Sequence, residues 1–340
     1  MLDFLQGDFI PKIPLDRWVD RFVDWAQGNL QDAFDVVRDV LRLLVRLLEA
    51  VMTAPPELVM VAILAAIAFF LSGWRVALFS VFGFFLLISL GLWNSTMLTL
   101  ALIIASAIIA LAIGIPLGIL AAKSRPFEAA IRPILDVMQT MPAFVYLVPM
   151  IVFLGLGEVP ALVATVVFAM PPAVRLTMLG IQQVPKDTVE AGQAFGATPM
   201  QTLRKVELPQ ALTTIMAGVN QVIMLSLSMV VIASLVGAGG LGEEVVLGLT
   251  QLDVGRAFVG GVGIVIIAIY LDRVTRSLSR APQHGGVKRG LGLGKGGGMS
   301  KILPGRKKPD VDPDTAGTTG AGTEDTAEDA EGAEAGDRSR

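Results

Sequence analysis

The sequence predicts an all-α membrane protein with about seven transmembrane helices. Of its 340 residues, 53% are hydrophobic and only 17% are charged, and the mean hydropathy is +0.66. Several uncharged runs approach or exceed the roughly 20 residues that a helix needs to cross about 30 Å of hydrocarbon. Lys and Arg gather beside these runs, whereas acidic residues crowd the end of the chain. A soluble domain of this size would need far more polar surface.

The composition also excludes several kinds of chemistry. The chain has no cysteine, which excludes disulfides, thiolate chemistry and cysteine-based metal sites. Its single histidine, His284, lies in a Gly-rich stretch and argues against a histidine metal site or catalytic triad. No GxxxxGK[ST] phosphate-binding loop occurs, so we expect the chain not to hydrolyse ATP. We therefore expect no enzyme activity, cofactor, metal or nucleic acid partner for this chain.

The first 56 residues are predicted to form an N-terminal segment outside the membrane domain. Residues 1–29 have mixed charge and are expected to be irregular. Residues 30–52 form a strongly amphipathic helix, because polar residues recur at steps of three and four: Gln31, Asp35, Arg38, Arg42, Arg46 and Glu49. The favoured interpretation is a helix lying in the membrane interface; the alternative is a helix packed on the rest of the protein. Pro55 and Pro56 end it.

The membrane domain is predicted to cover residues 57–280. The apolar runs place its seven spans at 57–72, 74–93, 95–122, 134–157, 159–180, 210–236 and 257–272. Basic residues flank alternate ends of these spans: Arg75; Lys123, Arg125 and Arg132; Arg175, Arg204 and Lys205; and Arg273, Arg276 and Arg280. The positive-inside tendency puts these ends in the cytoplasm. An odd number of spans then leaves the N-terminus outside and the C-terminus inside.

Residues 281–340 differ in composition from the rest of the chain. They are first Gly-rich and basic, then acidic. Such a segment cannot bury an apolar core, so we expect a disordered cytoplasmic tail. Because its basic half follows the membrane domain directly, binding to lipid or to a partner is a further hypothesis.

A polar segment between two apolar spans, EAGQAFGATPMQTLRKVELP at 190–209, reads as helix rather than loop. Asp187 stands three residues before Glu190, the spacing of an N-capping residue and its reciprocal acid. A short helix is therefore expected over 188–195. Gly196 should end it, because glycine tolerates the left-handed conformation of a helix C-terminus.

A second helix is predicted directly after this bend. Thr198 and Gln201 repeat the capping spacing around Pro199, which suits a first helical turn. The helix should run towards Glu207, and Pro209 should interrupt the backbone where the next span begins. The result is a rigid helix–bend–helix knob over 187–207. Such a knob suits the transmission of force from a soluble partner, although an ordinary well-capped loop remains the alternative.

The spacing of this segment resembles the signature of ATP-binding-cassette importer permeases. The match consists of Glu190, Ala191, Gly196, Val206, Leu208 and Pro209, with Gly192 in place of the usual second alanine and Val206 in place of isoleucine. In that family the segment is the coupling helix that docks in a groove of the cytoplasmic ATPase. The resemblance implies ATPase-coupling roles for Asp187, Glu190, Ala191, Gly192, Gly196, Thr198, Pro199, Leu208 and Pro209.

Further segments are similar to the permease subunit of the glycine betaine/L-proline importers. They lie at 13–20, 135–150, 168–185, 214–242 and 260–273, and the similarity extends over residues 11–278. The resemblance implies a type I importer permease fold in the bacterial inner membrane and ATP-driven import of glycine betaine, proline or a relative. It also implies a homodimer, in contact with membrane lipid, that works with an ATPase carrying ATP and Mg and with a separate extracytoplasmic solute-binding protein.

Two alternatives to this function stay open at the level of the sequence. The solute could instead be choline, carnitine or an ectoine-like compound within the same class of complex. A transporter driven by an ion gradient would need no ATPase, but it predicts inverted repeats and paired buried charges. Neither feature is clear in this sequence.

Residues of the solute pathway follow from family position: Met141, Phe144, Tyr146, Asn220, Met224 and Ser228. Aromatic rings and Met can contact a methylated ammonium group softly, with cation–π attraction of about 0.5–2 kcal/mol per ring. The same side chains could equally face lipid or pack between helices.

Two glycine patterns are predicted to be structural. GAGGLG at 237–242 satisfies GxGxxG, but no βαβ unit surrounds it, so we expect a tight glycine turn rather than a dinucleotide site. Gly114 and Gly118, on either side of Pro116, are expected to permit close helix packing.

Overall fold

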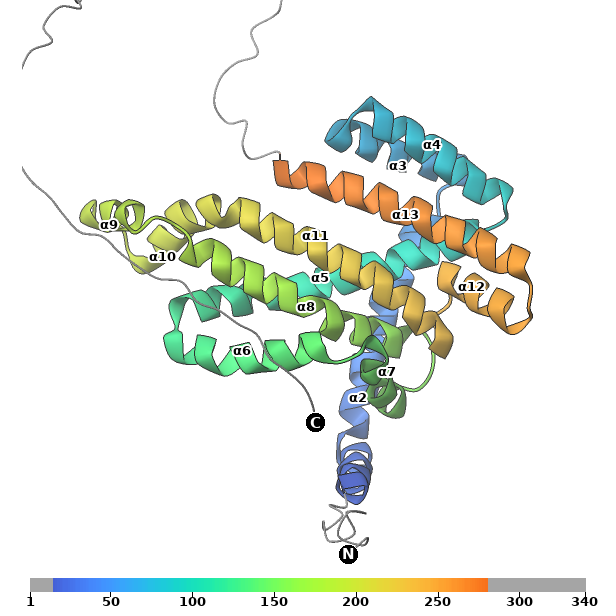
Figure 1. Cartoon of the computed structure of the whole chain (residues 1–340), viewed down its shortest axis with the longest axis horizontal. Coiled ribbons are helices and arrows are strands. Elements are labelled where there is room, and N and C mark those ends of the chain that lie inside the picture. The colour runs from blue at the N-terminus through green and yellow to red at the C-terminus, as the bar shows by residue number, and fades with distance from the viewer. Residues whose placement is uncertain (1–14, 281–340) are drawn as a thin grey trace, which may run out of the picture. The chain divides into compact units, whose positions relative to one another are not determined.

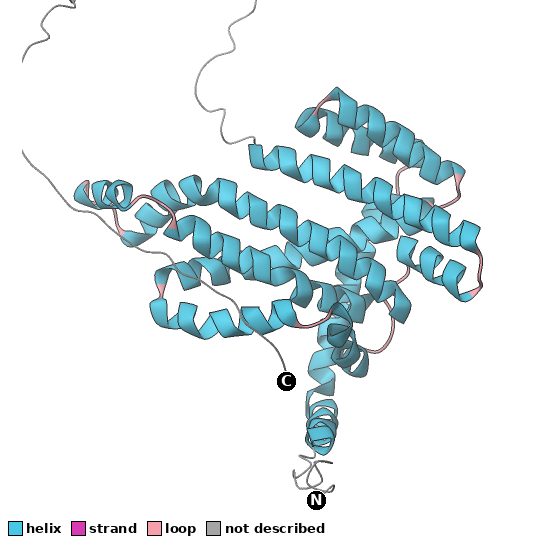
Figure 2. Ribbon diagram, in the orientation of Figure 1, coloured by secondary structure: helices cyan, strands magenta, loops and turns pink. Residues whose placement is uncertain are grey.

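The computed structural model describes residues 15–280, and every element assigned within that range is helical (Figures 1 and 2). The α-helices are α2 (Leu15–Thr53), α3 (Glu57–Ser72), α4 (Trp74–Ser89), α5 (Trp93–Lys123), α6 (Arg125–Thr140), α7 (Ala143–Leu154), α8 (Glu158–Gln182), α9 (Lys186–Ala194), α10 (Pro199–Thr202), α11 (Leu208–Ala233), α12 (Gly240–Thr250) and α13 (Val254–Arg280). A π-helical turn spans Leu203–Glu207 and a 3-10 turn spans Ser234–Val236. The predictions for residues 1–14 and for the tail at 281–340 lie outside the described residues.

Four helical stretches within the described residues are long and apolar enough to cross a membrane: α5, α8, the continuous stretch Pro199–Val236, and the stretch Val254–Ser277 of α13. Two bent pairs, α2 with α3 and α6 with α7, raise this number to 6 if each pair is one broken span. α4 is apolar but shorter. The seven predicted spans therefore all coincide with helical segments, but by length and composition only four to six of these described segments qualify as membrane crossings.

The span predicted at 134–157 is not one continuous helix but covers the end of α6 and the whole of α7, a bent pair that passes as a span only if its two helices are taken together. α6 ends at Thr140, and α7 begins at Ala143 in a direction that differs by 99°. Pro142 explains the break, because a proline disfavours the helical conformation of the residue before it. Met141 is accordingly extended, with ψ 134°. α6 is itself amphipathic rather than uniformly apolar, so only α7 has the composition of a buried membrane segment.

The prediction that residues 1–29 are irregular is wrong from residue 15 onwards. α2 begins at Leu15 and continues for 39 residues. Asp16, Asp20, Asp24 and Gln27 extend the polar stripe towards the N-terminus at the same spacing of three and four residues. The periodicity of 30–52 is therefore part of a longer pattern. In the structure, α2 runs across the direction of α5, α8 and α11 (Figure 1).

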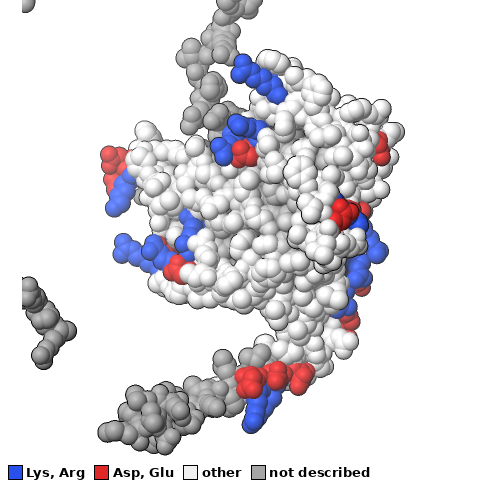
Figure 3. All heavy atoms as spheres, turned by 45° about the vertical axis from the view of Figure 1, so that its right-hand side comes forward, with Lys and Arg blue, Asp and Glu red and all other residues white. Residues whose placement is uncertain are grey.

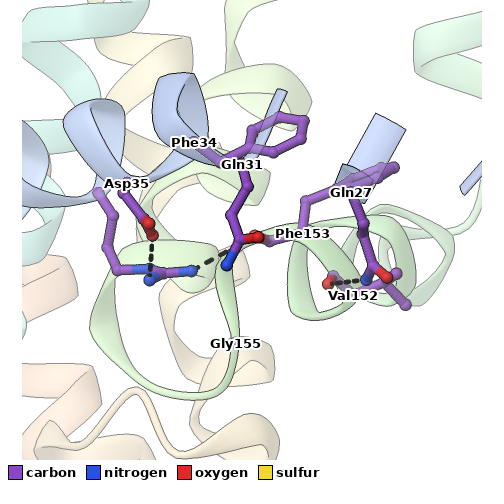
Figure 4. Close-up of a pocket in the computed structure, with 8 residues that line it drawn as sticks. Gln27, Gln31, Phe34, Asp35, Val152, Phe153 and Gly155 are labelled. Carbon is purple, nitrogen blue, oxygen red and sulfur yellow. Dashed lines mark hydrogen bonds and ion pairs between the residues drawn. The ribbon is translucent and has the colours of Figure 1, made fainter. Parts of the chain in front are cut away.

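The polar stripe of α2 packs on the end of α7 (Figure 4). Gln27 Nε2 donates to the carbonyl of Val152 at 2.9 Å, and Arg38 Nε donates to the carbonyl of Leu154 at 3.1 Å. Carbonyls in the last turn of a helix have no partner within that helix, so these side chains satisfy acceptors that would otherwise be unpaired. The interpretation as a helix packed on the protein is confirmed for this stripe.

The apolar surface of α2 packs on the protein along one side, where Val45 is buried in the largest apolar cluster and Leu41, Leu44, Leu48 and Met52 pack against it, and is exposed along the other. Its exposed large side chains include Trp18, Phe22, Trp25, Val36, Val40, Leu43, Leu47 and Val51. Exposed Trp and Phe on an amphipathic helix suit the boundary between headgroups and acyl chains. The two interpretations therefore apply to different sides of one helix: the polar stripe and the adjacent apolar side pack on protein, and the outer apolar side is available to lipid.

Small residues bring α5, α8 and α11 into close contact. A Cβ atom added at Gly118 would lie 2.6 Å from the carbonyl oxygen of Val174, and one at Gly114 would lie 2.7 Å from Ala173 Cβ. At Gly180, the added atom would lie 3.2 Å from the carbonyl oxygen of Ala211. The predicted role of Gly114 and Gly118 in helix packing is confirmed. Close backbone approach of this kind is how helices associate in a membrane.

The GAGGLG segment is a tight turn between the 3-10 turn and α12, as predicted. Gly237, Gly239 and Gly240 have φ of +84°, +77° and +75°, values that favour glycine. The turn is tied to α5 because the backbone N–H of Leu241 donates to Thr99 Oγ1 at 2.9 Å.

Charged side chains are unevenly distributed over the face shown in Figure 3. They lie along opposite edges of the helical bundle and along α2, and the surface between them is almost free of charge. An uncharged band between charged edges is the pattern expected of a protein that crosses a bilayer.

Candidate functional site

The knob predicted over 187–207 lies at one end of the bundle, where α9 and α10 extend past α8 (Figure 1). α9 covers Lys186–Ala194, and its N-cap is Pro185. The expected N-cap role of Asp187 is wrong, because Asp187 lies inside the first turn and makes no capping bond. The carbonyl of Pro185 already accepts from the N–H of Thr188 at 3.1 Å, which starts the helix earlier. Asp187 still places a negative charge near the positive end of the helix dipole.

The predicted stop at Gly196 is confirmed. Gly196 has φ +81°, and its N–H donates to the carbonyl of Gln193 at 2.8 Å. The next N–H, from Ala197, donates to the carbonyl of Gly192 at 3.2 Å. These two bonds make a Schellman motif, which fixes the direction in which the chain leaves a helix.

The second cap is also confirmed. Thr198 Oγ1 accepts from the backbone N–H of Gln201 at 3.3 Å, and the Thr198 N–H donates to Gln201 Oε1 at 2.9 Å. Pro199 occupies the first position of α10, where its missing N–H costs no hydrogen bond. Both ends of the bend are therefore held by local hydrogen bonds, which makes the knob stiff.

The expected interruption at Pro209 is wrong. The helix runs without a break from Pro199 to Val236, through the π turn at Leu203–Glu207 and past Pro209. A proline inside a helix removes one hydrogen bond and crowds the preceding turn. The wider π turn lies directly before Pro209 and gives the chain room for both effects. As a result, the second helix of the knob is a rigid extension of α11.

The two helices of the knob touch at Gly192. A Cβ atom added there would lie 3.5 Å from Val206 Cγ2, which is ordinary van der Waals contact. Alanine would thus fit as well as glycine, which explains physically why either residue can occupy this position. Leu208 is half-buried at the start of α11, and Pro209 is exposed.

The outer surface of the knob combines polar and apolar side chains. The predicted residues Asp187, Glu190, Ala191, Gly196, Thr198 and Pro199 are all exposed. Two apolar side chains missed by sequence reasoning join them: Phe195 is 93% exposed and Met200 is 55% exposed. Exposed apolar side chains on a stiff projection indicate a surface that another protein covers. Phe195 could have been identified from the sequence, because it is an aromatic residue directly before the glycine that ends the helix.

The predicted pathway residues on α6, α7 and their junction lie near one another. Met141 and Tyr146 pack in one cluster with Met229 of α11. Tyr146 is buried and its hydroxyl donates to the carbonyl of Met138, while its ring lies 6.0 Å from that of Phe168. Phe144, by contrast, is 55% exposed.

The pathway residues predicted on α11 have other surroundings. Asn220 Oδ1 accepts from the hydroxyl of Thr275 on α13, which gives Asn220 a helix-packing contact. Met224 packs against the largest apolar cluster, which includes α5 and α13 residues. Ser228 is exposed, and its hydroxyl donates to the carbonyl of Met224 at 3.2 Å. The six residues thus do not form one site within this chain, and their pathway role stays a prediction.

Comparison with known proteins identifies the family. A family model described as "Binding-protein-dependent transport system inner membrane component" matches residues 114–283, which include the entire knob. The chain belongs to this family. The binding-protein-dependent permeases are transport subunits, so this chain is a membrane transport subunit rather than an enzyme.

Two relatives from this permease family match over most of their length. The glycine betaine transport system permease protein OpuAB of Bacillus subtilis (strain 168) is 48% identical over 271 residues, which cover 80% of this chain and 96% of OpuAB. The glycine betaine/proline betaine transport system permease protein ProW of Escherichia coli (strain K12) is 46% identical over 277 residues, which cover 82% of this chain and 78% of ProW.

A solved structure has the same fold. A chain from the inward-facing conformations of the MetNI methionine ABC transporter matches with a TM-score of 0.52 and 27% identity, covering 56% of this chain and 95% of that chain. The chain therefore has the type I ABC importer permease fold in an inner membrane, and it serves an ATP-driven, binding-protein-dependent importer. Membership of this family favours ATP-driven import over transport driven by an ion gradient.

Proposed function

We propose that this chain is the permease subunit of an importer of glycine betaine or a closely related methylated zwitterion. The names of OpuAB and ProW support this solute class, since both are close to half identical to this chain. Choline, carnitine and ectoine-like compounds are the alternative solutes. The mechanism rests on one observation about the knob at 187–207. Hydrogen bonds fix both sides of its bend, Phe195 is exposed at that bend, and the second helix continues directly into α11.

The importer acts as an assembly around a pair of these chains. Two cytoplasmic ATPase subunits bind ATP and Mg, and each docks on one knob, which requires a homodimeric permease. A separate extracytoplasmic protein delivers the solute. The basic span ends favour a cytoplasmic position for the knob and the C-terminus, with the N-terminus outside. ATPase closure pushes on the knob, and α8 and α11 carry this displacement to the pathway.

Solute uptake by the reconstituted complex tests this proposal. Labelled glycine betaine should enter liposomes that contain the permease, the ATPase and the binding protein, and only when ATP is supplied to the ATPase side. Unlabelled proline betaine should compete strongly, and choline or carnitine more weakly. Uptake that proceeds without the ATPase would contradict the proposal, and preferential uptake of choline would select an alternative solute.

Phe195 is expected to anchor the ATPase. Truncation of an exposed aromatic anchor at an interface typically costs about 2 kcal/mol, so Phe195→Ala should weaken ATPase binding roughly 30-fold. The fold should be unaffected, because the side chain is 93% exposed. Affinity of the detergent-solubilised permease for purified ATPase measures the effect. Phe70→Ala on α3, where the side chain is 83% exposed, is the matched control and should leave affinity unchanged; equal effects of the two changes would argue against the anchor.

A further inference from the structure

An ion pair joins the base of the knob to α5. Lys123 is the last residue of α5, and its ammonium group pairs with Oε2 of Glu207, the last residue of the π turn. The Glu207 side chain is only 6% exposed, whereas that of Lys123 is 42% exposed. A carboxylate with so little access to water keeps its charge at a high free-energy cost unless a cation stays beside it. The pair therefore holds α5 and the π turn at a fixed separation.

Open space surrounds this contact. Two cavities of about 320 and 360 Å³ adjoin it, and Lys123, Gln193 and Glu207 line both of them. One cavity extends to Glu190 on α9, and the other extends to Met200 on α10. The ion pair is thus the charged contact between the end of α5 and the π turn, and it lies beside the apolar packing of Ala122 near Leu203.

The chain itself connects the knob to α8 and α11. α9 follows α8 through Pro185, and α10 continues through the π turn into α11. α5 also packs directly on the π turn and α11, because Ile115, Ile119 and Ala122 pack against the apolar cluster that contains Leu203 of the π turn and Ala211 and Ile215 of α11. The ion pair adds a charged contact to these connections, and it acts at the very end of α5.

We propose that Lys123 and Glu207 are positioning residues that transmit ATPase-driven movement of the knob to α5, an inference that rests on the coupling function proposed above. Neither residue contacts ATP or solute in this role. They make the end of α5, the π turn and α11 move as one body, so that the helices on both sides of α8 change position together. Without the pair, the ATPase hydrolyses ATP as before, but fewer hydrolysis cycles import a solute molecule.

The ratio of solute imported to ATP hydrolysed tests this role. In liposomes that contain the complete complex, Glu207→Gln and Lys123→Gln should each keep ATPase activity within about twofold and lower the ratio about fivefold, the size of effect that mutations along a coupling route produce. Glu207→Gln preserves the shape of the side chain, so it remains informative if Lys123→Gln is not recovered from membranes. Arg132→Gln is the control, because it removes a cation from the exposed pair with Glu128 on α6 and should leave the ratio unchanged.

A charge exchange and a stability measurement separate positioning from simple stabilisation. Lys123→Glu combined with Glu207→Lys should recover part of the lost ratio, although each single reversal lowers it. Unchanged ratios in both glutamine variants would overturn the proposal. So would a proportional loss of ATPase and uptake that accompanies a lower melting temperature, since that outcome indicates a structural role. If the wild-type complex itself imports no solute, the proposed function fails instead.

Discussion

Replacing Gly196 with tryptophan is expected to lower solute uptake at least about tenfold while the complex continues to hydrolyse ATP, because a bulky group in a docked surface disrupts the contact with the partner. Gly196 is exposed, and no heavy atom would lie within 4 Å of an added Cβ atom. The indole can therefore extend outward without disturbing the membrane bundle. Its bulk then separates the knob from the ATPase groove, and nucleotide-driven closure no longer moves α8 and α11.

Backbone strain is the competing explanation, and alanine isolates it. Gly196 has φ +81°, so any other residue there costs roughly 1–2 kcal/mol. Gly196→Ala carries that strain without the bulk and should retain most of the uptake. Glu190→Arg, a charge reversal on the exposed surface of α9, should act in the same direction as the tryptophan. The measurement is uptake and ATPase activity in the same liposomes, and full uptake by both Gly196→Trp and Glu190→Arg would refute the coupling role.

Gly118→Leu is expected to prevent the membrane bundle from folding. The added Cβ atom would lie 2.6 Å from the backbone carbonyl oxygen of Val174 and 2.7 Å from Thr177 Cβ. A backbone atom cannot move aside as a flexible side chain can, so α5 and α8 must separate along their contact. Overpacking of a tight core costs about 1–3 kcal/mol, and the larger leucine at a backbone contact should exceed this range. The yield of monodisperse protein in detergent and its melting temperature should both fall sharply.

Gly261→Leu is the matched control for this change. Gly261 lies in α13, and no heavy atom would lie within 4 Å of a Cβ atom added there. The same substitution should therefore leave yield and melting temperature close to those of the wild type. Equal behaviour of the two variants would mean that the α5–α8 contact is looser than the glycine packing indicates.

Local sequence patterns predicted the knob well because their hydrogen bonds close within a few residues. Thr198 and Gln201 are three positions apart and form two hydrogen bonds with each other. The left-handed conformation of Gly196 is held by its own bond to Gln193 and by the bond of Ala197 to Gly192. The prediction for Asp187 failed because Pro185 started the helix first. The prediction for Pro209 failed because a π turn, which has no simple sequence signal, precedes the proline and gives the helix room to continue past it.

Longer-range features of the fold were only partly accessible from the sequence. The apolar runs predicted where α5, α8, α11 and α13 lie, since the energetic demand of a bilayer acts on each segment separately. The bend between α6 and α7 was not predicted because residues 134–157 together have the length and mean hydropathy of one span, although the half before Pro142 is amphipathic. The amphipathic pattern of α2 could not say which face meets protein, because a polar stripe can face either water or unpaired carbonyls.

The sequence alone determined the class of this protein, its main helices and the knob caps at Gly196 and Thr198, because these depend on composition and on contacts a few residues apart. Tertiary structure alone decided that Glu207 is buried beside Lys123, that Asn220 meets Thr275 and that Phe195 is left uncovered. Whether a polar side chain finds a partner depends on which distant helix lies next to it. That neighbour is set by the packing of the whole bundle and not by the residues on either side.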